Sequence, residues 1–176
     1  MEGIEVIKKR RSIRKFRDQH ISEEDLHSLL ECAMSGPTAV NAQEWEFLVV
    51  RDKANLKKMA EAKGKFAELL VGADVGIMVL GNIDKAYEGG KDFWIIDGAI
   101  AAQNICLSAR ALNIGSCMIG VYPMEGPVER LKALYELPEG IMPHTIIALG
   151  YALDEKELEL GNRSSYDEAK VHYEKY

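Results

Sequence analysis

The sequence predicts a single α+β domain over residues 1–176. Three observations support this prediction. The chain has 176 residues, close to the usual size of one domain, and 47% of them are hydrophobic, enough for a sizeable core. Segments with helical spacing of apolar residues alternate with short runs rich in aromatic and β-branched residues. No repeat, low-complexity tract or linker divides the chain.

The first part of the chain contains two helical patterns. Residues 2–10 form a short one, and residues 12–17 suit either an extended segment or a turn. Ser22 with Asp25 three positions later resembles a capping box, which begins a helix. Apolar residues then recur at helical spacing: Leu26, Leu29, Leu30, Ala33 and Met34.

Strands and shorter helices follow in alternation. The aromatic and β-branched run at 45–50 predicts a strand, which we expect to be central in the sheet. Asp52 can cap the next helix, and residues 66–70 predict another helical piece. Further elements are a strand covered on both faces at 73–81, a short strand at 116–121, an amphipathic helix around 128–135 and a last strand at 144–150. The polar tail from 153 onward carries several aromatic residues that can dock on a surface.

The helix predicted at about 94–112 is apolar around nearly its whole circumference. A helix of this kind has to be buried on all sides. One helix can hardly be wrapped completely by a chain of this length, so a partner subunit is the economical explanation. Asp97, Gln103, Asn104 and Arg110 lie within this segment and are costly at the centre of a bilayer, so we expect a buried helix of a soluble protein. The sequence therefore predicts a homodimer and no membrane span.

Charge and cysteine content limit the classes of partner and compartment. The formal net charge is −6, which disfavours general attraction to nucleic acid or to anionic membranes. Cys32, Cys106 and Cys117 lie in apolar stretches at spacings that form neither a disulfide framework nor a metal motif. We expect them to be small core residues in a reducing, cytoplasmic protein, since the N-terminus also lacks the apolar core of a secretory signal.

A basic run near the N-terminus is the strongest local signal. It contains seven cations and no acid: Lys8, Lys9, Arg10, Arg11, Arg14, Lys15 and Arg17. Guanidinium groups form rigid forks for phosphate oxygens, and the Ser12 hydroxyl can add a further hydrogen bond. A phosphate-bearing ligand is one interpretation and a solvated charged surface is another. Nucleic acid is the weakest, because Phe16 is the only aromatic residue nearby.

The loop at 36–45 places Thr38, Asn41 and Gln43 between a helix and a strand. Their amides and hydroxyl can bind the polar edge of a heterocycle, but such residues also satisfy turns and helix caps. Motifs for other chemistry are missing: the sequence has no Gly-rich dinucleotide or P-loop signature, no paired histidines for a metal and no nucleophile elbow. We therefore expect no metal site.

Four segments together resemble the FMN-dependent nitroreductases, in the order and spacing of that family. They are Arg10 to Phe16 (RRSIRKF), Pro37 to Trp45, Asp97 to Ile119 and Val171 to Tyr176 (VHYEKY). The resemblance implies a nitroreductase-like α+β fold with a central mixed β-sheet flanked by helices. Two chains would intertwine through their long helices and C-terminal tails, with two equivalent FMN sites at the interface.

The resemblance also implies roles for individual residues. Arg10, Arg11 and Ser12 would hold the FMN phosphate and ribityl chain, and Arg163 from the tail would add charge at the phosphate. Arg14 would lie near the N1/O2 edge of the flavin, where a cation favours the anionic reduced form. The remaining contacts would be Pro37, Thr38 and Asn41 from the other subunit, Met118 and Ile119 on the ring face, and the backbone N–H of Gly120 at N5.

The implied reaction has two halves at one site. NADH or NADPH reduces the flavin, leaves, and is replaced by a nitroaromatic, quinone or flavin acceptor. No side chain has to act as an acid or a base, so no catalytic residue is expected. Alternatives are the same fold with reductive dehalogenation or flavin fragmentation, or a non-enzymatic module that binds an anion. Glu44 replaces the proline common before Trp45 in the family, and we expect the variable segments 63–70 and 82–92 to set specificity.

Overall fold

The computed structural model describes residues 2–161 and 166–176. The helices are α1 (Gly3–Lys9), α2 (Glu23–Met34), α3 (Lys53–Lys63), α4 (Phe93–Ala111), α5 (Glu125–Leu134) and α6 (Lys156–Glu159). The strands are β1 (Trp45–Val50), β2 (Val75–Asn82), β3 (Gly115–Gly120) and β4 (Ile141–Gly150). Short 3₁₀ helices are η1 (Ala39–Asn41), η2 (Glu68–Gly72), η3 (Glu88–Gly90) and η4 (Glu168–Lys170). The predicted alternation of helices and strands is confirmed.

The strands form one sheet in the order β1-β2-β4-β3, and each neighbouring pair is antiparallel. The predicted α+β class is confirmed, but the prediction of a mixed sheet is wrong for the described strands. A parallel pairing occurs at the isolated bridge between Ser12 and Ser116. The mixed sheet was implied by the family resemblance alone, because the spacing of apolar residues identifies a strand and does not show the direction in which it pairs.

The position of β1 also differs from the prediction. We expected this strand to be central, but it lies at the edge of the sheet and pairs only with β2 among the described strands. Its residues are half-buried except for Val50, which is buried. Aromatic and β-branched residues suit a half-buried edge as well as a central strand. In contrast, β2 is central and almost wholly buried, as its unbroken apolar run predicts.

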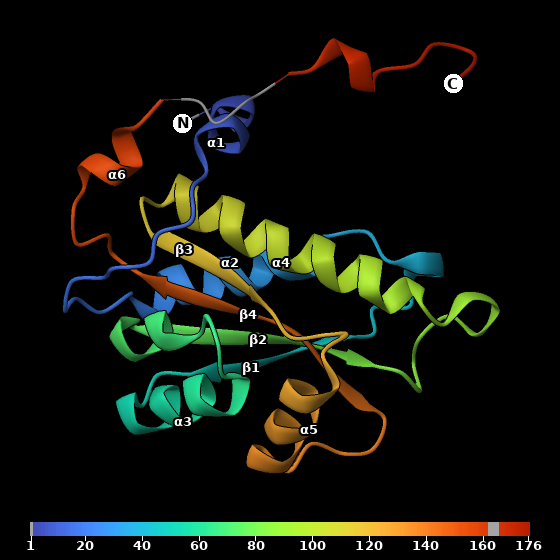
Figure 1. Ribbon diagram of the computed structural model, residues 1–176, viewed down its shortest axis with the longest axis horizontal. Coiled ribbons are helices and arrows are strands. Elements are labelled where there is room, and N and C mark those ends of the chain that lie inside the picture. The colour runs from blue at the N-terminus through green and yellow to red at the C-terminus, as the bar shows by residue number, and fades with distance from the viewer. Residues whose placement is uncertain (1, 162–165) are drawn as a thin grey trace.

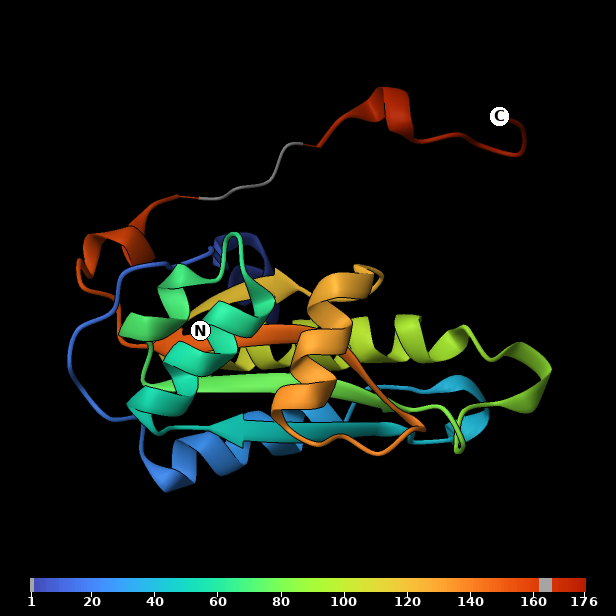
Figure 2. The same ribbon diagram turned by 60° about the horizontal axis from the view of Figure 1, so that its bottom comes forward.

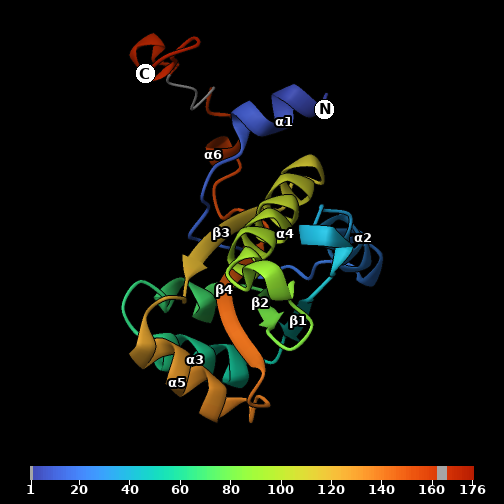
Figure 3. The ribbon, with the colours of Figure 1, turned by 90° about the vertical axis from the view of Figure 1, so that its right-hand side faces the viewer.

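Helices cover both faces of the sheet, which gives three layers (Figure 3). Alternate residues of β2 point to opposite faces. Ile77 and Val79 pack with α2 and α4, while Met78 and Leu80 pack with α3 and α5. Two predicted caps are present: Ser22 Oγ accepts from the Asp25 N–H at 3.0 Å, and Asp52 Oδ1 accepts from the Asn55 N–H at 2.8 Å. The two helix caps therefore lie where the sequence predicts that α2 and α3 begin.

The long helix α4 is buried on one side only. Trp94, Ala101, Ile105 and Ala109 lie in the interior, whereas the side chain of Ile96 remains 54% exposed. The chain therefore covers only part of the circumference of this apolar helix. The helices that the structure describes include none with the length and apolar character that crossing a bilayer requires.

Two surface features complete the fold. Residues 166–176 are exposed along their whole length and lie apart from the sheet and its helices (Figures 1 and 2). Cys106 and Cys117 are buried as expected, but the expectation for Cys32 is wrong, because this residue is exposed on α2. An amphipathic helix has a solvent face, and a cysteine on that face is not distinguished by composition from one in the core.

Candidate functional site

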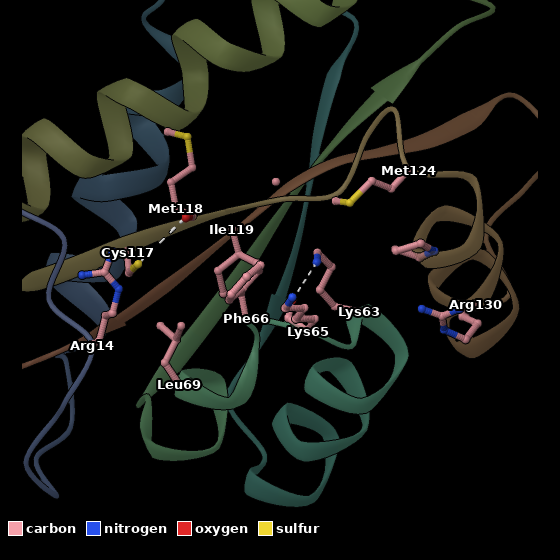
Figure 4. A pocket seen from close by; sticks show the side chains of 12 residues that line it. Arg14, Lys63, Lys65, Phe66, Leu69, Cys117, Met118, Ile119, Met124 and Arg130 are labelled. Atoms are coloured by element: carbon pink, nitrogen blue, oxygen red, sulfur yellow. Dashed lines mark hydrogen bonds between the residues drawn. The ribbon is translucent and has the colours of Figure 1, made fainter.

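The basic N-terminal segment lies against the start of β3. The Ile13 N–H donates to the Ser116 carbonyl at 2.9 Å, and the Ile13 side chain is 1% exposed. Gly115 permits this approach, because a Cβ there would lie 2.9 Å from the Ile13 side chain. With Ile13 anchored in the interior, the exposed Arg14 on the next position is placed beside Cys117 and Met118 (Figure 4).

A pocket of about 640 Å³ begins at Arg14 and follows β3. One wall is formed by Cys117, Met118, Ile119 and Gly120. The end of α3, the segment from there into η2 and the residues around α5 supply the rest: Lys63, Lys65, Phe66, Leu69, Met124, Pro127 and Arg130. Figure 4 shows Arg14 at one end of this pocket and Arg130 at the other. Four of the predicted site residues, Arg14 and 118–120, are therefore brought together.

The pocket suits a flat aromatic group with an anionic edge. Met118 is 42% exposed and lines the cavity, while a Cβ built on Gly120 would meet nothing within 4 Å. An apolar floor with open space above it can receive a planar ring, and the volume lies in the usual range for cofactor sites, roughly 300 to 1,000 Å³. The cation at Arg14 matches a ring edge that becomes negative on reduction. FMN fits this set of residues.

The other basic residues predicted for the site do not line this pocket. Arg10, Arg11 and Ser12 precede it along the chain and are half-buried. Arg11 Nη1 donates to the Gly161 carbonyl at 3.5 Å, so the chain just after α6 approaches the basic segment. Arg163 lies outside the described residues.

The loop containing Pro37, Thr38 and Asn41 lies at the other end of α4. The Ala39 N–H donates to Asp97 Oδ2 near the start of this helix, at 2.9 Å, whereas the basic segment meets β3 just after the helix ends. One chain therefore does not bring this loop to the pocket.

The same loop is conformationally unusual. Val40, Asn41 and Gln43 have φ values of 48°, 58° and 51°, in the left-handed region that non-glycine residues seldom adopt. Thr38 Oγ1 accepts from the Gln43 N–H at 3.0 Å, and Asn41 Oδ1 accepts from Gln43 Nε2 at 3.3 Å. Strain of this kind persists only where surrounding contacts enforce it, and it is concentrated at functional sites. The hydrogen bonds within the loop therefore hold it in a defined conformation.

A buried carboxyl lies beneath the loop. Glu44 and Asp97 are 2% and 4% exposed, and Glu44 Oε2 has no hydrogen-bond partner among the described residues. Burial raises the pKa of Glu44, and the neighbouring Asp97 carboxyl raises this pKa further. The sequence marks Glu44 only as a departure from the family pattern. Its burial beside Asp97 depends on a contact between the loop and α4, which the sequence does not reveal.

The sequence also does not indicate that three cations lie together at the far end of the pocket. Lys63 is the last residue of α3 and Lys65 follows it, while Arg130 lies on α5, more than sixty positions later. The segment 63–70 was expected to influence specificity, and the structure places it in the pocket wall. The other segment, 82–92, does not line this pocket. In the part of the chain that the structure describes, no three His, Cys, Asp or Glu side chains are grouped to hold a metal ion.

Comparison with known proteins identifies relatives along the whole chain. The model of the Nitroreductase family matches residues 7–151. A protein of Archaeoglobus fulgidus, provisionally named NADH dehydrogenase/NAD(P)H nitroreductase, is 41% identical over 99% of this chain and 99% of its own length. The structure of an FMN-dependent nitroreductase from Clostridium difficile R20291 is 30% identical with a TM-score of 0.87, covering 98% of this chain and 99% of that one. A nitroreductase-type structure in complex with FMN, from Desulfovibrio desulfuricans, is 26% identical with a TM-score of 0.80 and covers 100% and 98%.

Proposed function

Because the chain belongs to the nitroreductase family, we propose that it is an NAD(P)H-dependent oxidoreductase that holds FMN in the pocket along β3. The observation that carries this proposal is the pocket itself, in which an apolar strand face and the Arg14 guanidinium line one cavity of suitable size. The names of the relatives agree with it, since they include NAD(P)H nitroreductase and FMN-dependent nitroreductase.

The residues of this chain would divide the binding of FMN between them. Met118 and Ile119 would contact the flat face of the ring, and the backbone N–H of Gly120 would be directed at N5. Arg14 would lie at the pyrimidine edge and favour the reduced anion there. Arg10, Arg11 and Ser12 would hold the phosphate through charge-assisted hydrogen bonds, with Arg163 as a further cation.

FMN, when bound, supplies the capacity to accept a hydride from a reduced nicotinamide and to pass the electrons to an acceptor. The protein contributes binding, orientation and electrostatics. We propose nitroaromatics, quinones or free flavin as acceptors, because the open side of the pocket accommodates flat molecules. Protons can come from solvent, so no side chain is assigned as a catalytic acid or base.

We further propose that the active form is a homodimer in which Pro37, Thr38 and Asn41 of the partner complete each site. Two observations support this arrangement. The strained loop has a defined conformation but does not line the pocket of its own chain. In addition, Ile4 and Ile7 on α1 and Ile96 on α4 are 71%, 59% and 54% exposed, and Ile7 lines an apolar groove of about 540 Å³ between α1, α2 and α4. Burying these side chains would stabilise an interface.

A spectroscopic titration tests the function directly. We expect the purified protein to be yellow or to become so with FMN, to bind one FMN per chain, and to lose its visible absorption under anaerobic NADH or NADPH. Addition of a quinone should restore the colour. A colourless protein that cannot be loaded with FMN would contradict the proposal and favour a non-enzymatic anion-binding module. A product screen with iodinated tyrosines and free reduced flavin tests the reductive alternatives.

A further inference from the structure

Lys63, Lys65 and Arg130 form a cation cluster at the end of the pocket opposite Arg14 (Figure 4). None of the three is needed to explain how an apolar ring lies on β3. In the described part of the chain, none lies within ion-pair distance of a carboxylate. Three cations grouped around a cavity without a counterion repel one another, and an anion in the cavity would relieve this repulsion.

Lys63 is the most constrained member of the cation cluster. Only 5% of its surface is exposed, although lysine is almost never buried without a partner. Its ammonium group donates one hydrogen bond, to the Lys65 carbonyl at 3.1 Å, and an ammonium has three donors. Burial lowers the pKa of Lys63 and the nearby Arg130 lowers it further, with Glu68 acting in the opposite direction. This buried ammonium lines the pocket with donor capacity to spare.

Arg130 is held so that its terminal nitrogens remain available. Its Nε donates to the Ala62 carbonyl at 2.7 Å, which fixes the guanidinium beside the end of α3. Two glycines leave room for it: a Cβ on Gly126 would lie 3.2 Å from Nη1, and one on Gly64 would lie 3.6 Å from Nη2. A fork fixed through Nε can offer both Nη groups to a phosphate or carboxylate.

Phe66 adds an aromatic surface next to these cations. Its ring is 70% exposed in the pocket wall, and its φ of 72° is in the left-handed region. Lys65 Nζ lies 4.9 Å from the ring centroid. A large apolar side chain held exposed in a strained backbone is costly unless something covers it. Together, the ring and the cation cluster match a flat molecule that carries a negative group.

We propose that Lys63, Lys65 and Arg130 bind the anionic group of a flat aromatic substrate while its ring contacts Phe66. This inference rests on the proposed function, because the substrate is the molecule that exchanges electrons at the β3 end of the pocket. The shared chemistry is a phosphate or a carboxylate. A phosphate would belong to the nicotinamide donor, and a carboxylate to the acceptor.

Matched substrate pairs separate these two sources. For the donor, NADH and NADPH are compared with reduced nicotinamide riboside, which lacks phosphate. For the acceptor, 4-nitrobenzoate is compared with nitrobenzene. The quantity measured is the ratio of kcat/KM for the charged substrate to kcat/KM for its uncharged counterpart, in protein whose FMN content has been determined.

Three variants remove one charge each: Lys63→Met, Lys65→Gln and Arg130→Gln. We expect each to lower the ratio about tenfold or more in one of the two comparisons, as befits a charge-assisted hydrogen bond. Lys58→Gln on the exposed face of α3 is the matched control and should leave both ratios within about twofold. A fall in the donor ratio assigns the group to a nicotinamide phosphate, and a fall in the acceptor ratio assigns it to a carboxylate.

Ratios that stay within about twofold in both comparisons, with FMN content and melting temperature unchanged, would overturn the proposal. If Lys63→Met does not fold, the exposed Lys65→Gln decides. Calorimetric binding of 4-nitrobenzoate and nitrobenzene requires no turnover. A protein that fails to bind FMN but still prefers 4-nitrobenzoate, with the preference lost in Lys65→Gln, contradicts the proposed function and leaves the anion subsite standing. Equal binding of the two compounds by the parent protein, together with a donor ratio that stays unchanged in all three variants, contradicts the subsite.

Discussion

The two ends of the structure treat uncompensated charge in opposite ways. At the pocket, the cation cluster of Lys63, Lys65 and Arg130 faces an open cavity. Beneath the loop near the start of α4, Glu44 and Asp97 form a carboxyl pair that is sealed from solvent. Among the described residues, neither group has an ion-pair partner. Asp97 accepts a hydrogen bond from the Ala39 N–H, and Lys63 donates one to the Lys65 carbonyl. They differ in whether a ligand can reach them.

This difference indicates two separate uses of an uncompensated charge. A cation beside a cavity can be neutralised by a bound anion, so its cost is recovered when substrate arrives. A sealed carboxyl has only one way to avoid the cost of charge in a low-dielectric interior, which is to keep its proton. The cation cluster thus concerns recognition, whereas the carboxyl pair concerns the shape of the loop that would reach the partner subunit. In the proposed dimer the two regions meet across the interface.

The largest effect is expected when the two regions are prevented from meeting. Ile96→Glu places a carboxylate on the exposed apolar face of α4 and should dissociate the dimer, because an unpaired charge in an apolar interface is strongly unfavourable. Loss of the partner loop should weaken FMN binding by roughly 100-fold or more, the consequence of losing several contacts at once. Light scattering and FMN titration measure the two effects.

Asn55→Glu, on the exposed surface of α3, introduces the same charge away from this face and should change neither quantity. If Ile96→Glu remained a dimer with the FMN affinity of the parent, the site would be complete within one chain. The division between pocket and partner loop would then have to be abandoned.

Local signals in the sequence predicted local structure well. Ser22 and Asp52 were identified as caps, and both accept the expected backbone hydrogen bonds, because a cap depends on residues within one turn. The buried run of β2 likewise follows from composition along a single segment, whereas α4, expected to be buried on all sides, leaves Ile96 exposed within one chain. Arg14 and the residues 118–120 were placed together by family resemblance, and the structure finds them in one pocket.

The features that the sequence did not reveal are nonlocal. β1 has the residues of a central strand but lies at the edge, since strand order depends on how connections cross the sheet. Arg130 joins Lys63 only because α3 and α5 cover the same face, and the Nε contact to Ala62 makes that pairing specific. Glu44 becomes unusual only once Asp97 is known to lie beside it. Pairs of this kind require coordinates.

A second prediction examines the pocket alone. Arg14→Met keeps most of the apolar length of the side chain and removes the charge at the proposed pyrimidine edge. We expect FMN affinity to fall roughly 10- to 100-fold, and the two-electron potential of the flavin to become more negative, because a cation that favours the reduced anion is gone. Equilibrium titration and a redox dye assay measure these changes.

Lys15→Met is the matched control, since Lys15 is the exposed neighbour of Arg14 and does not line the pocket. It should change FMN affinity by no more than about twofold and leave the two-electron potential of the flavin unchanged. Equal behaviour of the Arg14 and Lys15 variants would remove Arg14 from the site and leave recognition to the remaining residues.

The smallest effect concerns the sealed carboxyl pair and is visible only as a function of pH. The folded-state pKa of Glu44 is raised above its ordinary value of 4.5. Its contribution to stability is therefore fully present below this value and is lost as the pH rises through the folded pKa. Glu44→Gln cannot ionise, so the variant should gain stability relative to the parent as the pH increases, by roughly 1 to 2 kcal/mol once Glu44 has ionised in the parent. Denaturant unfolding from about pH 5 to about pH 8 measures this difference. Glu61→Gln, exposed on α3, should follow the parent throughout. Parallel stability curves for Glu44→Gln and the parent would mean that the loop tolerates the charge, and the contrast with the open cation cluster would no longer hold.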